Sequence, residues 1–598
     1  MTFFVVFNSD GAPVDSERIR ARYHEVPRNV RLLGPTRQIA LMWADPDTDL
    51  GSKDVRHPVE VDRRFWLLGR IRIDGRDGLS AALSASETES DALLCLRAYI
   101  RWGENCVGHL RGDFCFVLWD EVRHMLFCAR DQLGVRPMFY ARIKNSWVVS
   151  DSLDTVACYS GLTGDLDDLW IADFLTKGYC VDFDRTVYKH IKRLAPAHAL
   201  VGSLGDSAPK RYWALEVDEP IVYRRRSNYL DHFHEVLSRA VEDRLPPGRV
   251  GIAMSGGLDS TTLAAKTLEV TGDASRVVAY TKYFDHLMPD DEPYFSALVA
   301  RKLKLAHTLR AVDDVYDPQL LDLEIQPQEP EGSSMRSSFR RSVEAEMVSQ
   351  AKVWFYGEGP DNALTFEWRP YLRWLINRRD WIRLGGAIAQ YLRGKEAREW
   401  LMTVENMSTR RRDTETISQP GFPHWLHKDL VERFDLAARA QSSADRRRQT
   451  HPWRPRAIAT FRNIMLQSYL EAHDTAISGT YLDCRHPFLD LRVLTFMLRT
   501  PPIPWGRRKR LIREAMRGVL PEEVLARDKA PLVADSRTKV VRKTPLSPLS
   551  IDETLHRFVD PAKLPAESHL QSGTDPLARL LALDSWLKSR RNMNYALT

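Results

Sequence analysis

The sequence of 598 residues has no apolar run approaching the roughly 18 residues that a membrane-spanning helix needs. Residues 1–7 are apolar, but they are too short for the core of a signal peptide, lack a basic start and are typical of a buried strand. These absences predict a cytoplasmic protein with no membrane partner. Hydrophobic residues make up 43% and charged residues 28% of the chain, which favours a globular protein with more than one domain.

Cysteine is scarce and the charge is nearly balanced. The seven cysteines are an odd number, widely spaced and without a Cys-x-x-Cys pair, which argues against a disulfide framework and a zinc site. The net charge of +6 is modest for this length. Arginine clusters at 410–412 and 446–448 could contact nucleic acid or an acidic peptide, but such runs are more often solvated surface. We therefore expect no nucleic-acid partner.

The N-terminal part, residues 1–210, is expected to be an α+β domain. It contains short strand-like segments such as 65–73 and 113–120, and a helical pattern over 91–102. This texture is typical of antiparallel sheets stacked with helices. Residues 211–225 form the expected linker to the next domain.

The pattern changes over residues 226–598 to alternating strands and helices, which is typical of a parallel sheet. Beyond residue 357 the chain is expected to be mainly helical. The strands expected in this domain are 249–254, 276–284, 307–312 and 352–356, and the helices are 227–244, 261–269 and 292–303. We therefore predict an α/β domain with helical additions.

A glycine loop follows the first of these strands. Its residues are Ser255, Gly256, Gly257, Leu258, Asp259 and Ser260. Glycines allow backbone N–H groups to approach a phosphate closely, and the N-terminus of the next helix adds partial positive charge. The loop lacks the Gly-Lys-Ser/Thr of the Walker pattern. Because a carboxylate at Asp259 would repel phosphate, its presence predicts a Mg²⁺ ion between them.

A second group of carboxylates follows another apolar strand, and it comprises Gly357, Glu358, Gly359, Pro360 and Asp361. Ligands of open parallel sheets bind beyond the carboxyl ends of the strands, so Asp259 and Asp361 are expected to face one crevice and to hold Mg²⁺. The alternative is an ordinary acidic turn. The residues predicted to bind ATP are Ser255, Gly256, Gly257, Asp259, Ser260 and Gly357.

Several further segments, with these two loops, resemble the asparagine synthetase superfamily. They are 102–103, 110–114, 119–120, 129–137, 186–198, 211–213, 483–490, 509–515, 520–521 and 527–529. The resemblance implies a degenerate Ntn-glutaminase-like αββα sandwich, followed by an adenine-nucleotide α-hydrolase-like (PP-loop) parallel sheet. It also implies an enzyme that adenylates a carboxylate with ATP, releases pyrophosphate and lets an amine displace AMP.

The same resemblance assigns two catalytic roles. Lys529 would neutralise charge that develops on pyrophosphate or on the tetrahedral oxyanion. Glu358 could take a proton from the attacking ammonium as a general base. Arg485 and Lys509 rank below Lys529, and His473 and His486 are weak candidates because a lone histidine is more often structural.

Residue 2 departs from the glutamine-dependent members of the superfamily, which expose a cysteine there. Here it is Thr2, whose hydroxyl is a far weaker nucleophile than a thiol. We therefore expect the amine to be free ammonia or a group on the substrate. Residues 487–492, 501–505 and 513–518 most resemble the macrolactam-forming cyclases of lasso peptides.

That resemblance predicts a precursor peptide as the substrate, closed between an Asp or Glu side chain and its N-terminal amine. A leader peptidase and a leader-binding protein would be its partners. The alternatives are an ammonia-dependent asparagine synthetase, a β-lactam-synthetase-like ligase, a nucleic-acid-modifying protein and an inactive scaffold. β-Lactam synthetases pair a tyrosine with a glutamate where this chain has Glu358.

Overall fold

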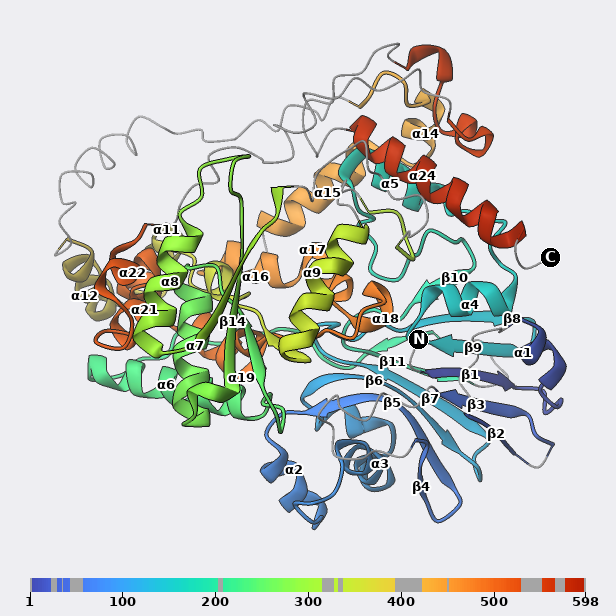
Figure 1. The fold of residues 1–598 in the computed structure, drawn as a ribbon, viewed down its shortest axis with the longest axis horizontal. Helices are drawn as coiled ribbons and strands as arrows, with labels where there is room; N and C mark the ends of the chain where they lie inside the picture. Colours follow the sequence, from blue (N-terminus) through green and yellow to red (C-terminus); the bar gives the residue numbers. More distant parts are fainter. Residues whose placement is uncertain are drawn as a thin grey trace.

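The computed structural model describes residues 3–22, 29–34, 36–43, 57–202, 208–313, 327–331, 337–392, 422–448, 451–528, 551–564 and 576–595. Two six-stranded antiparallel sheets fill the N-terminal half, and a five-stranded parallel sheet lies in the C-terminal half (Figure 1). None of the helices in these ranges is both long and apolar enough to cross a membrane.

The first antiparallel sheet has the order β10-β8-β9-β1-β3-β2 and the second β12-β11-β7-β6-β5-β4. The strands are β1 (Phe3–Asn8), β2 (Asn29–Leu33), β3 (Ile39–Trp43), β4 (Val59–Val61), β5 (Phe65–Ile73), β6 (Gly112–Asp120), β7 (Met125–Arg130), β8 (Phe139–Ile143), β9 (Ser146–Ser150), β10 (Ile191–Arg193), β11 (His198–Gly202) and β12 (Lys210–Arg211). The helices are α1 (Ser16–Arg22), α2 (Arg76–Leu83), α3 (Asp91–Trp102), α4 (Leu153–Ser160) and α5 (Asp168–Lys177).

Alternation of side chains along β1 builds the layers of this half. Phe3, Val5 and Phe7 lie in the core between the two sheets. Phe4 and Val6, which point the other way because side chains alternate along a strand, lie in a second core with α4 and α5. The outer face of the second sheet packs against α2 and α3. Two sheets therefore lie face to face, with helices on both outer faces.

The end of the chain completes the N-terminal half. α24 (Pro576–Tyr595) lies beside α5 (Figure 1), and its Leu580 and Trp586 are buried in the same core as Val6. This packing crosses the predicted division at residues 211–225, which stays a prediction.

The parallel sheet has the order β15-β14-β13-β16-β17. Its strands are β13 (Val250–Ala253), β14 (Val277–Tyr283), β15 (Ala306–Ala311), β16 (Val353–Phe355) and β17 (Asp483–Arg485). The first helices around it are α6 (Arg226–Glu242), α7 (Leu258–Thr271), α8 (Glu292–Leu303) and α9 (Ser337–Gln350). Each predicted strand and helix of this domain is therefore confirmed to within a few residues.

β17 is a short strand that the sequence did not predict within a region expected to be mainly helical. Two of its three residues, Asp483 and Arg485, are charged, so the sequence pattern does not predict a strand here. Both are buried, because Asp483 accepts hydrogen bonds from Arg485 at 2.8 Å and from Arg136 of the N-terminal half at 2.9 Å.

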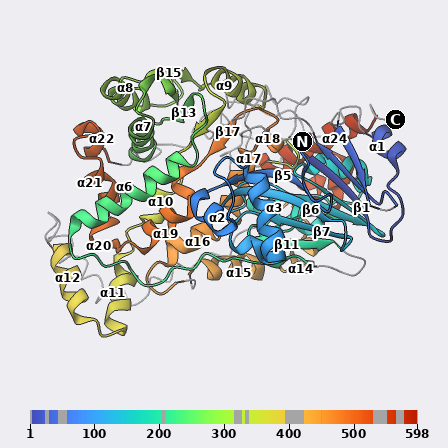
Figure 2. The same cartoon turned by 90° about the horizontal axis from the view of Figure 1, so that it is seen from below.

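Helices do dominate the rest of this half. They are α10 (Pro360–Ala363), α11 (Trp368–Asn377), α12 (Trp381–Leu392), α14 (Lys428–Arg433), α15 (Leu436–Arg448), α16 (Pro455–Phe461), α17 (Ile464–Ala472), α18 (Thr475–Ser478), α19 (Leu491–Arg499), α20 (Pro502–Trp505), α21 (Arg510–Ala515) and α22 (Glu522–Ala526). α11 and α12 lie at the end of the molecule opposite β1 (Figure 2).

Candidate active site

Two neighbouring strands bring the two predicted loops together. β13 and β16 are adjacent and parallel, so the glycine loop after β13 and the Gly357–Asp361 segment after β16 leave the same edge of the sheet. A Cβ on Gly357 would lie 2.9 Å from the backbone nitrogen of Ser260. Such a separation is too short for any side chain, so glycine is required for this close approach.

The glycine loop folds back onto the start of α7. The backbone N–H of Ser255 donates to Ser260 Oγ at 3.0 Å, and Thr261 Oγ1 donates to the carbonyl of Gly257 at 2.8 Å. Gly256 takes a left-handed φ of 59°, which glycine adopts without strain. The N-terminus of a helix of this length favours a bound anion, as the sequence predicted for this loop.

Asp259 and Asp361 are brought together by a lysine. Lys509 Nζ lies 2.5 Å from Asp259 Oδ2 and also contacts Asp361. The other oxygen of Asp259, Oδ1, is buried without a hydrogen-bond partner. Burial, with Asp361 and Glu358 nearby, raises the pKa of Asp259 to about 6 against the opposing effect of Lys509. Two close carboxylates with a spare buried oxygen fit the oxygen ligands that Mg²⁺ prefers.

Lys509 is a site residue that the sequence ranked below Lys529. Its φ is 52° and that of the preceding Arg508 is 48°, so two consecutive residues other than glycine are left-handed. Such conformations cost roughly 1–3 kcal/mol each and cluster at functional sites. No sequence pattern signals this turn, although Lys509 begins a segment that carries the family resemblance. Lys529, ranked first by sequence, lies outside the described residues, as does Thr2.

Glu358, on the segment after β16, is exposed and accepts a hydrogen bond from a tyrosine. Tyr469 Oη donates to Glu358 Oε1 at 2.8 Å. Burial and the adjacent Glu358 raise the pKa of Tyr469 well above its usual value, so the tyrosine stays protonated and acts as the donor. This contact occupies Oε1 of Glu358 and does not use the second carboxylate oxygen.

The two histidines and Arg485 have structural surroundings. Burial lowers the pKa of His473 to about 4 and that of His486 to about 3, so both rings are uncharged near neutral pH. His473 Nδ1 lies 2.8 Å from the carbonyl oxygen of Tyr469. Arg485 donates to Asp483 and, at 2.6 Å, to the carbonyl of Arg244.

Asp259, Asp361 and Lys509 line one cavity of about 1110 Å³ with the glycine loop, Glu358, Tyr469 and His473. It exceeds the range of about 300–1,000 Å³ usual for small-molecule sites. Besides Lys509, the cations that the described part of the chain contributes to its walls are Lys282, Arg508, Arg513 and Arg527. Cations beside a loop that favours anions suit a triphosphate, and the remaining volume leaves room for a second substrate.

Comparison with known proteins agrees with this geometry. Residues 232–588 match the Asparagine synthase family. The chain belongs to this family. Residues 74–213 match the Glutamine amidotransferase domain. Asparagine synthase family enzymes are ATP-dependent, amide-bond-forming ligases that produce AMP and pyrophosphate.

Several relatives cover most of the chain. "Asparagine synthetase [glutamine-hydrolyzing] 3" of Bacillus subtilis is 24% identical over 87% of this chain and 85% of its own length. "Amidase chyE" of Penicillium rubens is 23% identical over 75% of this chain and 73% of its own length. The likeness therefore extends across both the amidotransferase-like half and the synthase half.

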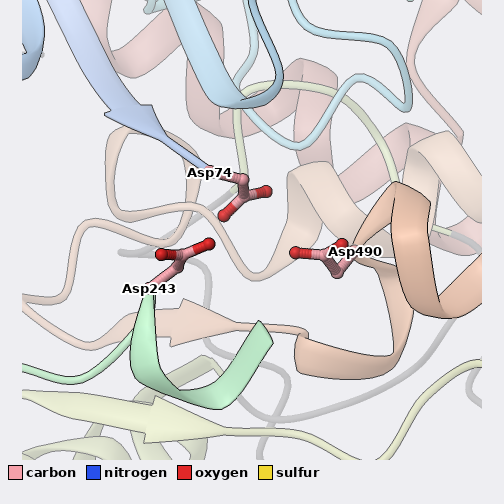
Figure 3. Close-up of side chains that lie close together, drawn as sticks. All are labelled: Asp74, Asp243 and Asp490. Carbon is pink, nitrogen blue, oxygen red and sulfur yellow. The ribbon is translucent and has the colours of Figure 1, made fainter. Parts of the chain in front are cut away.

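A second carboxylate cluster lies between these halves. Asp74 at the end of β5, Asp243 just after α6 and Asp490 at the start of α19 converge in Figure 3. Arg244 lies 2.9 Å from Asp74 and 2.7 Å from Asp490, and Arg492 lies 2.5 Å from Asp243. Because guanidinium groups already neutralise these carboxylates, the cluster joins the synthase half to the amidotransferase-like half rather than holding a metal.

Proposed function

We propose that this asparagine synthase family member is a macrolactam-forming peptide cyclase. It would activate an Asp or Glu side chain of a precursor peptide and close it onto the N-terminal amine of the same peptide, as in lasso peptide biosynthesis. One observation carries the proposal. A large cavity holds Asp259, Asp361 and Lys509 beside the glycine loop, in a chain that has Thr2 where the glutamine-dependent members of the superfamily expose a cysteine.

The first step joins the peptide to AMP. An oxygen of the side-chain carboxylate attacks the α-phosphorus of ATP, the bond to the bridging oxygen breaks, and pyrophosphate leaves. Ser255, Gly257 and Ser260 would bind the phosphates, and Asp259 and Asp361 would hold Mg²⁺. When bound, the metal shields the negative charge of the triphosphate.

The second step forms the amide. The N-terminal amine attacks the acyl carbon, Glu358 takes the proton that the amine loses, and AMP leaves with the bonding electrons. Tyr469 would keep Glu358 oriented towards the amine. Lys509 and the proposed Lys529 would offset negative charge on the leaving groups.

The size of the cavity favours a peptide over free aspartate as the second substrate. The second candidate is an ammonia-dependent asparagine synthetase or a β-lactam-synthetase-like amide ligase. The contact between Tyr469 and Glu358 favours the latter, because β-lactam synthetases pair a tyrosine with a glutamate. A leader peptidase and a leader-binding protein remain part of the proposal, and adjacent genes for a short precursor and a protease would support it.

The test supplies the enzyme with ATP, Mg²⁺ and synthetic peptides that each have a free N-terminus and one internal Asp or Glu at a different position. AMP formation together with a product lighter by one water supports the cyclase. AMP formation with aspartate and ammonia, and with no peptide, overturns it in favour of the second candidate. N-acetylated peptides should still exchange pyrophosphate into ATP but form no ring.

A further inference from the structure

α17 presents opposite faces to two parts of the molecule. Gln467 and Glu471 are four residues apart and share the face towards the amidotransferase-like half. Tyr469 and, just past the helix, His473 line the cavity. Because each residue turns an α-helix by about 100°, side chains two positions apart point in nearly opposite directions. The rotation of this one helix therefore sets both contacts.

The face of α17 that carries Gln467 and Glu471 is fixed to the amidotransferase-like half by a buried ion pair. Glu471 Oε1 accepts from Arg130 Nη2 at 2.6 Å and from Gln467 Nε2 at 2.8 Å. Arg193 Nε lies 3.1 Å from Glu471 Oε2. The Arg130 guanidinium is fully buried and also donates to the backbone carbonyls of Gly134, Leu194 and Arg136 at 2.6–2.7 Å. Glu471 is thus anchored to a rigid part of the other half.

The segment after α17 is held in the same way. Arg136 donates to Asp474 and to Asp483, both at 2.9 Å, and Arg70 contacts Asp474. Arg70, Arg130, Arg136 and Arg193 all come from the amidotransferase-like half, and they pair with Glu471 of α17 and with Asp474 and Asp483 in the segment that follows it. Buried ion pairs with several hydrogen bonds fix geometry more than they add stability.

We infer that Arg130 and Arg193 are positioning residues for amide-bond formation. Through Glu471 they fix the rotation of α17, and α17 holds Tyr469 against Glu358. The inference rests on the proposed function, because it assigns Glu358 to the second step. A misplacement of about 1 Å at a catalytic group can cost 10²-fold in rate. The amidotransferase-like half thereby acts on the reaction without hydrolysing glutamine.

The decisive variant is Glu471→Gln, which keeps the shape of the side chain and removes its charge. Pyrophosphate–ATP exchange with an N-acetylated peptide measures adenylation alone, and single-turnover ring closure with the free peptide measures the second step. We expect exchange within about twofold of wild type and ring closure slower by about tenfold or more. A merely structural role would lower both rates together.

Asp173→Asn is the matched control. Asp173 is a fully buried carboxylate that pairs with Arg439 at 2.9 Å across the same two halves, away from α17. The Asp173→Asn variant should leave the ratio of the ring-closure rate to the pyrophosphate-exchange rate unchanged. An equal change of that ratio in Asp173→Asn and Glu471→Gln would overturn the inference.

Tyr469→Phe tests whether Glu471 affects ring closure through Tyr469. If Glu471 acts through Tyr469, adding Glu471→Gln to Tyr469→Phe should slow ring closure by less than about twofold further. Full multiplication of the two effects overturns the inference.

Two fallbacks keep the test decisive. If Glu471→Gln loses exchange because it does not fold, Arg193→Lys is measured instead, and unchanged ring closure there overturns the inference. If the wild type uses aspartate and ammonia, the proposed function fails separately, and the same ratio is measured on asparagine formation.

Discussion

The cavity and the junction between the halves each gather carboxylates around a cation, but they differ in how completely the charges are paired. Asp74 and Asp490 meet Arg244 in a buried network. Asp259 keeps one oxygen without a hydrogen-bond partner and shares Lys509 with Asp361 at the edge of a cavity. The paired cluster joins the two halves and the under-paired one is suited to binding a cation, so the number of nearby carboxylates alone does not identify a metal site.

Asp259→Asn should show the largest difference between the cavity cluster and the junction cluster. It removes a predicted Mg²⁺ ligand, and we expect pyrophosphate exchange to fall by about 10³-fold. The pKa of Asp259 is raised to about 6, so its contribution to stability is present below the unfolded pKa near 4 and is lost as the pH rises through 6. The variant should therefore be more stable than wild type at pH 8 without Mg²⁺, by about 1–3 kcal/mol. A lower free energy of unfolding in urea would contradict this.

Arg244→Met should have the opposite signature. It leaves Asp74 and Asp490 buried without their shared cation, which typically costs about 3–5 kcal/mol. We expect a lower free energy of unfolding in urea titrations, with pyrophosphate exchange per folded molecule near the wild-type value. A loss of exchange in fully folded protein would show that this cluster also serves the reaction.

Lys509→Met tests the lysine that contacts both Asp259 and Asp361. We expect exchange to fall by about 10²-fold, because a charged donor near developing negative charge is lost. Lys509→Arg should recover only part of this, since a guanidinium does not replace a compact ammonium. Full activity of Lys509→Met would assign the charge-neutralising role to other groups, with Lys529 the first to test.

Acid should weaken the contacts of Asp113, which lies beside Arg72 and near Arg244 of the junction. Although burial alone would raise it, Arg72 and Arg244 hold the pKa of Asp113 at about 2, and Arg72 lies 2.7 Å away. A lowered pKa contributes stability above the unfolded value near 4, and this is lost as the pH falls towards 2. Between pH 5 and pH 3, wild type should lose about 1–2 kcal/mol more than Asp113→Asn in urea titrations. Parallel curves would contradict the assignment.

The meeting of Asp259 with Asp361 could be predicted from sequence, because each follows a strand and parallel strands end at a common edge. The strand order that makes β13 and β16 neighbours then brings the two loops into contact. Local patterns also located α3 and α8, whose bounds match the predictions.

Other parts of the site depend on contacts that no local pattern records. Tyr469 is 111 residues from Glu358, and Lys509 reaches the carboxylates from a left-handed turn that favours glycine in most proteins. β17 is too short and too charged to look like a strand, and the partners of its charges, Arg136 and the carbonyl of Arg244, are distant in the sequence. These features belong to tertiary structure, where distant partners override local preference.

The packing of α24 against the N-terminal sheet constrains how the protein is made. The core that contains Val6 also contains Leu580 and Trp586, so the first sheet to be synthesised is covered by one of the last helices. At usual rates of translation the sheet waits roughly half a minute for that helix. Apolar surface left open for that time attracts chaperones and neighbouring chains. Yield in a heterologous host should therefore depend on chaperone supply, and the two halves cannot be produced separately by cutting at residues 211–225 without exposing this core.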